Sequence, residues 1–134
     1  MSHIRTAISI FLLSKLLITV KRVYAPVAAD DGLRILVDRL WPRGLSREQA
    51  RIDEWHKAIA PSAELRRWFA HEPDRYDEFQ RRYHAELECR EDQVAELKKS
   101  IGQSMGKGRC SLLYAAKDEI HNNAVALRTY LLAQ

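Results

Sequence analysis

The chain has 134 residues, of which 46% are hydrophobic and 30% are charged, and its formal net charge is +4. Such a chain is long enough for one domain with a sizeable core, and its composition excludes a mostly disordered protein. Acidic and basic residues are interspersed, so the small positive surplus favours a solvated mixed-charge surface over a nucleic-acid interface. Two cysteines outside any C-x-x-C pair, Cys89 and Cys110, indicate reduced thiols in a cytoplasmic protein.

The N-terminal region divides into an extension, residues 1–15, and a single domain, residues 16–134. Its apolar run, Ala7–Val20, is interrupted by Lys15 and is shorter than the roughly 20 residues that span a bilayer. Charged residues follow the run where a secretory signal would stay apolar, so we expect neither a signal peptide nor a membrane segment. The alternation of apolar and polar residues over Leu17–Tyr24 predicts a strand instead.

Two further strands are expected, at Leu33–Leu40 and Arg109–Ala116. The first of these follows the turn signal Asp30-Asp31-Gly32, and both are nearly continuous apolar runs, typical of strands buried on both faces. The connection from Ala25 to Gly32 is short for a parallel crossover, so the relative direction of the first two strands stays open.

The region from Ser46 to Ile101 is predicted to be a helical insertion between the second and third strands. Ser46 and Gln49 match a capping box, and they are expected to start a short helix that leads to Ile52, Trp55 and Ile59. Ser62 is expected to cap the next helix, and Pro73 fits the first turn of another. The apolar residues at helical spacing in these later helices are Leu65, Trp68, Phe69, Tyr76, Phe79, Tyr83, Leu87, Val94, Leu97 and Ile101.

A last helix is expected from about Ile120 to Leu132, with Ala124, Leu127 and Leu131 on its inner face. The elements together predict an α/β fold with a small mixed or parallel sheet and helices packed on it in Rossmann-like layers. In that fold the C-terminal ends of the second and third strands are expected to be adjacent, and ligands bind at such ends.

Polar residues gather where the second strand ends. Asp38, Arg39, Trp41 and Arg43 follow its apolar run within a few residues. The two arginines can present forked guanidinium donors to one anion, and the indole can supply an aromatic face beside them. Each residue also has a structural reading as a strand end, a core side chain or a turn, but their concentration favours a site.

The end of the third strand repeats this plan with Lys117, Asp118, His121, Asn122 and Asn123. Lys117 adds a cation and the two asparagines add ligand contacts, although helix capping explains Asp118 and the asparagines equally well. His121 changes its charge near neutral pH, so we interpret it, with Asp38 or Asp118, as a candidate for proton transfer.

Other kinds of site lack their sequence patterns. There is no H-x-x-x-H or H-E-x-x-H spacing for a metal and no G-x-S-x-G elbow for a serine hydrolase. Gly106-Lys107-Gly108 precedes a strand rather than a helix and is therefore interpreted as a plain loop. No cofactor and no oligomeric state follow from the remaining motifs.

Three segments resemble the YeaO-like branch of a bacterial family called domain of unknown function 488, from about Ile18 to Leu131. They are KRVYAPVAADDGLRILVDRLWPRGLS, EWHKAIAPSAELRRWF and LLYAAKDEIHNNAVAL. The resemblance implies an α/β fold and a small cytoplasmic protein. Longer relatives carry a Cys-His-Arg-like cluster near the motif that reads His121-Asn122-Asn123 here, so the resemblance does not carry a shared catalytic chemistry to this chain.

The leading functional hypothesis is a pocket for a phosphate- or carboxylate-bearing small molecule, with hydrolase or transferase chemistry as one use of it. The alternative is a non-catalytic module that binds nucleic acid or protein through its basic surface. The candidate contacts of that surface are Lys21, Arg22, Arg66, Arg67, Arg81 and Arg82.

Overall fold

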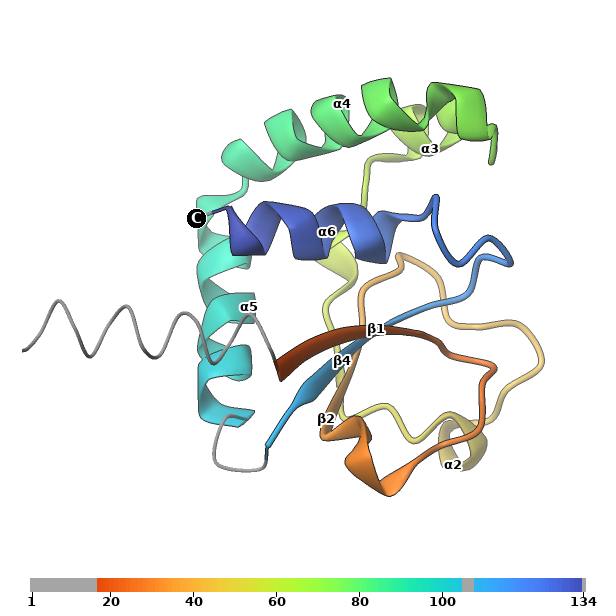
Figure 1. Ribbon diagram of the computed structural model, residues 1–134, viewed down its shortest axis with the longest axis vertical. Coiled ribbons are helices and arrows are strands. Elements are labelled where there is room, and N and C mark those ends of the chain that lie inside the picture. Colours follow the sequence, from red (N-terminus) through yellow and green to blue (C-terminus); the bar gives the residue numbers. More distant parts are fainter. Residues whose placement is uncertain (1–16, 105–107, 134) are drawn as a thin grey trace, which may run out of the picture.

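The computed structural model describes residues 17–104 and 108–133, which form a four-stranded sheet with helices around it (Figure 1). The strands are β1 (Ile18–Arg22), β2 (Leu33–Leu36), β3 (Glu54–Trp55) and β4 (Cys110–Tyr114). All pairings are parallel and the strand order is β1-β4-β2-β3. The prediction that the second and third expected strands, now β2 and β4, lie side by side is therefore confirmed. The predicted N-terminal extension, residues 1–15, lies outside the described residues.

The central strand is β4, and all five of its residues are buried. Cys110 is aligned with Ile18 of β1 on one side and with Leu33 of β2 on the other, so the neighbouring strands start level with each other. β1 and β2 thus point in the same direction without being hydrogen-bonded neighbours. The short connection between β1 and β2 therefore joins two parallel strands that are separated by β4. This settles the relative direction of the first two strands, which the sequence leaves open.

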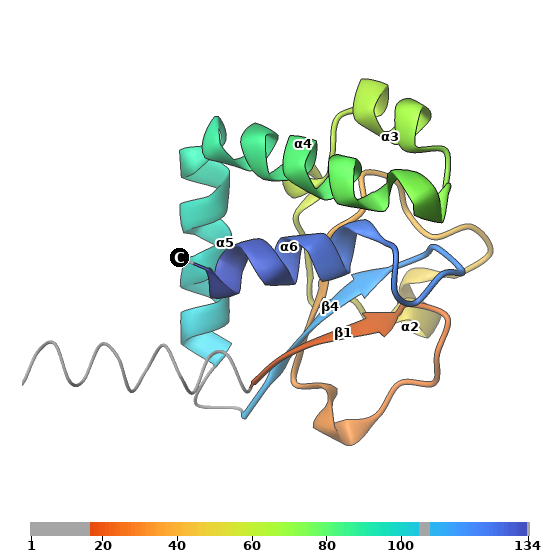
Figure 2. The same ribbon diagram turned by 45° about the horizontal axis from the view of Figure 1, so that its top comes forward.

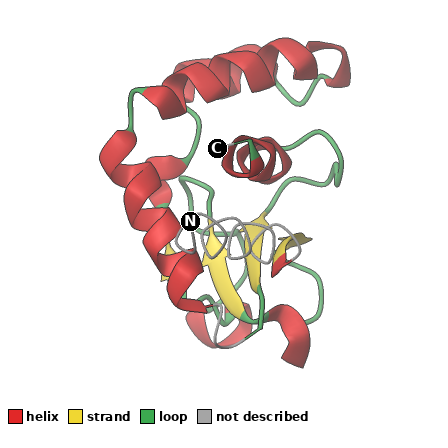
Figure 3. Ribbon diagram, turned by 60° about the vertical axis from the view of Figure 1, so that its left-hand side comes forward, coloured by secondary structure: helices red, strands yellow, loops and turns green. Residues whose placement is uncertain are grey.

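The helices are α2 (Arg47–Ala50), α3 (Ala63–Phe69), α4 (Tyr76–Glu88), α5 (Glu91–Ser104) and α6 (Asn123–Leu132). Three short 3-10 helices lie in the connections: η1 (Ala29–Asp31) between β1 and β2, η2 (Lys57–Ile59) between β3 and α3, and η3 (Pro73–Arg75) between α3 and α4. α6 packs on β1 and β4, and α4 packs on α6, so that α6 lies between the sheet and α4 (Figure 3). α5 lies beside this stack, with its axis across that of α6 (Figures 1 and 2). Among the described residues, no helix is both long and apolar enough to cross a membrane.

The main core fills the space between one face of the sheet and the helices. From α4, Phe79, Tyr83 and Leu87 are at most 2% exposed, as their spacing of three and four predicts. Tyr83 is completely buried, and its hydroxyl donates to the carbonyl oxygen of Ile59 at 2.6 Å. This bond ties α4 to η2, so that the chain before α3 has a fixed position beside the strand ends.

The opposite face of the sheet carries a smaller core of Val23, Leu36 and Leu113. The partly buried side chains that pack on it, which include Trp41 and Trp55, come mainly from residues 41–55. These residues, which we call the cover segment, contain one helix, the four-residue α2. The four-stranded parallel sheet with helices is thus established, whereas the Rossmann-like layers stay a prediction.

The cover segment departs from the predicted helical insertion. The capping box is present, because Gln49 N donates to Ser46 Oγ at 3.1 Å and Ser46 N donates to Gln49 Oε1 at 3.0 Å. However, α2 ends at Ala50, because Arg51 has a left-handed backbone with φ 47°. The helix is therefore short, as predicted, but the region after it is not helical throughout, because Trp55 lies in β3.

A buried arginine explains why α2 stops. Arg34, in β2, donates from Nη2 to the carbonyl oxygen of Ala50 at 2.8 Å and from Nε to that of Arg51 at 3.1 Å. Asp53 N then donates to the carbonyl oxygen of Arg34 at 2.9 Å, which starts the pairing of the chain with β2. Tertiary hydrogen bonds have here overridden the local preference for helix.

Two other boundaries also differ from the predictions. β2 ends at Leu36 rather than Leu40, because Ala115 N donates to the side chain of Asp38 instead of to a backbone carbonyl group. α6 begins at Asn123 rather than near Ile120, with Asn122 as its N-cap. Both changes place polar side chains at the C-terminal edge of the sheet.

Candidate ligand-binding site

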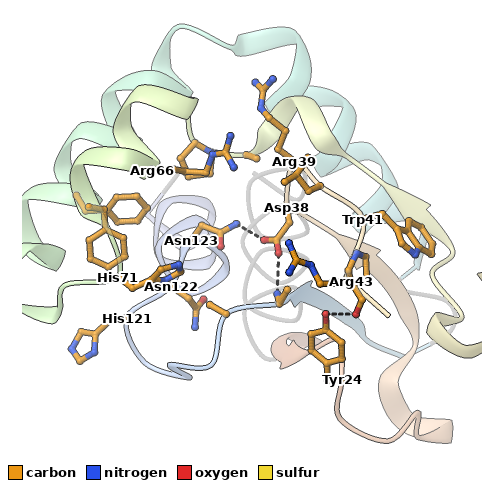
Figure 4. A pocket seen from close by; sticks show the side chains of 18 residues that line it. Tyr24, Asp38, Arg39, Trp41, Arg43, Arg66, His71, His121, Asn122 and Asn123 are labelled. Carbon is orange, nitrogen blue, oxygen red and sulfur yellow. Dashed lines mark hydrogen bonds between the residues drawn. The ribbon is translucent and has the colours of Figure 1, made fainter. Parts of the chain in front are cut away.

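A cavity of about 330 Å³ lies at the C-terminal ends of β2 and β4 (Figure 4). Its walls come from residues 38–43 after β2, residues 60–71 around α3, Phe79 of α4, and the turn that leads into α6. Small-molecule pockets usually occupy about 300–1,000 Å³, so this cavity suits a small ligand. Its place at the carboxyl ends of parallel strands is where α/β proteins commonly bind ligands.

Asp38 lies in the cavity wall directly beyond β2. Its Oδ2 accepts from Ala115 N at 2.9 Å, and its Oδ1 accepts from Asn123 Nδ2 at 3.1 Å (Figure 4). Burial raises the pKa of Asp38, although both hydrogen bonds and the positive charge of Arg66 oppose that rise. The carboxylate is thus fixed in position by the residue that follows β4 and by the first residue of α6, and it retains free acceptor capacity.

Three arginines line the same cavity: Arg39, Arg43 and Arg66. Among the described residues none of them forms an ion pair, and the buried Nε of Arg66 has no hydrogen-bond partner. Arg39 and Arg43 are exposed, and Tyr24 Oη donates to the backbone carbonyl oxygen of Arg43 at 2.8 Å. In Figure 4 the side chain of Arg39 extends away from Asp38.

Apolar side chains form much of the remaining wall. Phe69 and Phe79 stack with ring centroids 4.4 Å apart, and Pro61 and Leu40 also line the cavity. Trp41 is held by its Nε1, which donates to the carbonyl oxygen of Leu45 at 2.7 Å. A ligand at this site would therefore meet both hydrophobic and cationic groups.

His121 lines the cavity at its edge, and its ring points away from Asp38 in Figure 4. Its Nδ1 lies 2.9 Å from Asp118 Oδ2, and its ring packs edge-on against Tyr76 with centroids 5.2 Å apart. Asp118 Oδ1 accepts from the backbone N–H groups of Ile120 and His121 at 2.9 Å. The two backbone bonds and the imidazole lower the pKa of Asp118 to about 2, so this carboxylate stays ionised.

Asn122 and Asn123 have different partners. Asn122 is 2% exposed, and its Oδ1 accepts from Val125 N at 2.9 Å as the N-cap of α6. Asn123 donates from Nδ2 to Asp38 Oδ1 and to the carbonyl oxygen of Val37, at 3.1 Å and 3.2 Å. Asn123 therefore orients Asp38, whereas Asn122 is occupied with the helix end.

Seven of the predicted site residues line this one cavity: Asp38, Arg39, Trp41, Arg43, His121, Asn122 and Asn123. The structure places the other two elsewhere. Lys117 is exposed, and neither Lys117 nor Asp118 is part of the cavity wall. Asp118 contacts two residues of the wall, since its Oδ2 lies 2.9 Å from His121 Nδ1 and its backbone carbonyl oxygen accepts from Asn122 Nδ2 at 3.0 Å. Their predicted roles in anion binding and proton transfer stay predictions.

Arg66 and His71 also line the cavity, although the sequence analysis does not predict them as pocket residues. In the sequence, Arg66 is a candidate contact of the basic surface rather than of the pocket. A usable signal was present, since Arg66 and Phe69 are three residues apart and therefore share a side of the Ser62-capped helix. For His71 we find no such signal, because it lies beyond the helix with a left-handed backbone at φ 57°.

Cys110 and the acidic residues offer little other chemistry. Burial raises the pKa of Cys110 to about 11, so its thiol stays protonated and unreactive at neutral pH. Within residues 17–104 and 108–133, no group of three or more His, Cys, Asp or Glu side chains is arranged to hold a metal ion.

Comparison with known proteins identifies relatives of this chain. Residues 17–134 match a family profile described as "Inactive DUF488-N3 subclade". The chain is 43% identical to uncharacterized protein YeaO of Escherichia coli over 111 residues, which cover 83% of this chain and 93% of that protein. It is 47% identical to uncharacterized protein Rv3073c of Mycobacterium tuberculosis over 88 residues, or 66% of this chain and 74% of that protein. No solved structure matches the chain significantly. The resemblance noted in the sequence is thus confirmed, and the chain belongs to the YeaO-like DUF488 family.

Proposed function

We propose that this chain is a cytoplasmic protein whose cavity binds a small molecule bearing a phosphate or carboxylate group. The observation that carries the proposal is the set of three arginines, Arg39, Arg43 and Arg66, which line one cavity without ion-pair partners among the described residues. Arginine suits this task because its planar fork binds carboxylate and phosphate oxygens in pairs. The cavity's position where Rossmann-like layers bind ligands also supports it.

We propose binding rather than turnover as its principal activity. The matching profile is described as inactive, and the imidazole of His121 points away from Asp38. A hydrolase or transferase would require His121, with Asp38 or Asp118, to reach the reacting group of the ligand. That catalytic form of the hypothesis stays a prediction.

The alternative, a basic surface for nucleic acid or protein, has less support. Most of its candidate residues already contact other parts of the chain, and several of their partners are acidic. Lys21 pairs with Asp31, Arg22 donates to two backbone carbonyl groups, and Arg81 and Arg82 both pair with Glu78. These contacts reduce the positive charge that is available to a polyanion.

The test is a thermal-shift screen with a nucleoside monophosphate, a sugar phosphate and small carboxylates. A ligand present at ten times its Kd stabilises the native state by about 1.4 kcal/mol, which raises Tm by roughly 3–6 °C in a domain of this size. We expect Arg43→Ala and Arg66→Ala to reduce this shift strongly, because each removes a donor from the cavity wall.

Arg67→Ala is the matched control, because Arg67 is exposed, follows Arg66 in α3 and is not part of the cavity wall. Lys117→Ala separately tests whether that residue shares the anion, in which case its effect would be non-additive with that of Arg43→Ala. An absence of any shift at millimolar ligand, or equal shifts in wild type and both cavity variants, would contradict the proposal.

A further inference from the structure

The cavity contains more than an anion site needs, since it also has a partly buried carboxylate and apolar walls. Building on the proposed function, we propose that its ligand is a small amino-acid-like zwitterion with an apolar side chain. Asp38 would accept from the ligand's ammonium group, and Arg66 would bind its carboxylate. Three parts of the cavity wall match the three groups of such a ligand.

The first part is the carboxylate of Asp38. Its two hydrogen bonds come from neutral donors, Ala115 N and Asn123 Nδ2, and no described side chain forms an ion pair with it. A carboxylate has about four acceptor positions, so two remain for a ligand. Keeping a partly buried carboxylate ionised without an ion-pair partner is costly, and an ammonium group in the cavity would supply that partner.

The second part is the guanidinium of Arg66. Its Nε is buried without a hydrogen-bond partner, although unpaired buried donors are rare in native proteins. Arg66 is near enough to Asp38 for its charge to lower the pKa of that carboxyl, yet the two form no ion pair. A ligand that carries both an acid and an ammonium group would satisfy the two side chains together.

The third part is the apolar wall of Phe69, Phe79, Pro61 and Leu40. Leu40 is 68% exposed and lies at the cavity, where an apolar ligand group would cover it. A sugar phosphate would place hydroxyl groups against this wall without hydrogen-bond partners, which costs free energy. An apolar side chain instead gains from the burial, so the walls favour a ligand such as a hydrophobic amino acid.

Titration calorimetry on the full chain tests this inference with four probes that differ by one group. Phenylalanine carries all three features, 3-phenylpropanoate lacks the ammonium group, phenethylamine lacks the acid, and glycine lacks the ring. We expect phenylalanine to bind at least about tenfold more tightly than 3-phenylpropanoate, a difference that corresponds to about 1.4 kcal/mol. Phenethylamine and glycine are expected to bind more weakly than phenylalanine.

Two variants assign the groups. In Asp38→Asn the ratio of the Kd of 3-phenylpropanoate to that of phenylalanine should fall to about one, because the amide has no negative charge to attract the ammonium group of phenylalanine. Arg66→Gln should weaken the binding of both phenylalanine and 3-phenylpropanoate. Arg67→Gln should leave their Kd values unchanged, since Arg67 is not part of the cavity wall. The wild-type comparison needs no variant, so it decides the matter even if Asp38→Asn fails to fold.

Equal Kd values for 3-phenylpropanoate and phenylalanine in the wild type would contradict the proposal of a zwitterionic ligand. The proposed anion-binding function would not be affected by that result. If folded Asp38→Asn still bound phenylalanine more tightly than 3-phenylpropanoate, the proposal of a zwitterionic ligand would also be contradicted. If no acid and no phosphate binds, the proposed function fails together with this inference.

Discussion

Replacing Asp31 with asparagine is expected to lower the free energy of unfolding by about 3–5 kcal/mol, the usual effect of breaking a buried ion pair. Asp31 is 6% exposed, and its Oδ2 accepts from Arg34 Nη1 at 2.6 Å while its Oδ1 accepts from Lys21 Nζ at 2.8 Å. Arg34 is 4% exposed, so the substitution leaves a guanidinium buried beside a neutral side chain. Urea denaturation of both proteins measures the difference.

Asp30→Asn is the matched control in the same turn. The side chain of Asp30 is 76% exposed and lies 3.7 Å from Arg109, so losing this pair should cost less than about 1 kcal/mol. Similar losses in the two variants would show that the cluster of Lys21, Asp31 and Arg34 contributes no more than a surface pair, contrary to the prediction.

The effect of Asp31→Asn should also depend on pH. Burial opposes ionisation of Asp31, but hydrogen bonds from Ala28, Lys21 and Arg34 outweigh it and lower its pKa below the ordinary value of 3.8. A lowered pKa in the folded state gives stability that is present above pH 3.8 and is lost as the pH falls through the folded-state pKa. The difference between wild type and Asp31→Asn is therefore expected to shrink in acid.

The cluster of Lys21, Asp31 and Arg34 also explains why part of the fold could not be predicted from the sequence. The run LRIL predicts a strand but does not indicate on which face of the sheet its arginine lies. Only the structure shows that Arg34 is buried against the cover segment. Arg34 ends α2 through the carbonyl groups of Ala50 and Arg51, a tertiary contact that leaves no periodic trace in the sequence. Local patterns were sufficient for α4, because its buried residues recur at helical spacing within one element.

The candidate site was predictable to a similar extent. Residues that follow a strand directly, such as Asp38 and Arg43, can be assigned to the C-terminal edge of a sheet from their position alone. Arg66 reaches the same cavity from α3. Its spacing from the buried Phe69 indicates the inner side of that helix, but only packing between distant segments turns this side toward the strand ends. Lys117 lies outside the cavity wall, next to the turn in which Asp118 accepts from the backbone N–H groups of Ile120 and His121. The sequence does not reveal this placement of Lys117.

Gly32→Ala is expected to destabilise the protein by roughly 2–6 kcal/mol, the sum of a strained backbone and a steric clash. Gly32 has φ 67° and ψ −141°, a conformation that residues with a Cβ rarely adopt. An added Cβ would also lie 1.5 Å from the carbonyl oxygen of Arg109, so the backbone would have to move. The same oxygen accepts from Leu33 N at 3.0 Å, and the movement would therefore disturb the start of the β2–β4 pairing.

Gly102→Ala provides a control of opposite sign. Gly102 lies in α5 with no heavy atom within 4 Å of an added Cβ, so alanine should stabilise the helix by about 0.5–1 kcal/mol. Urea denaturation of the two variants gives both values, and a loss below about 1 kcal/mol for Gly32→Ala would contradict the clash. Because β2 and β4 carry Asp38 and Ala115 at their far ends, we also expect ligand binding to weaken in Gly32→Ala and to persist in Gly102→Ala.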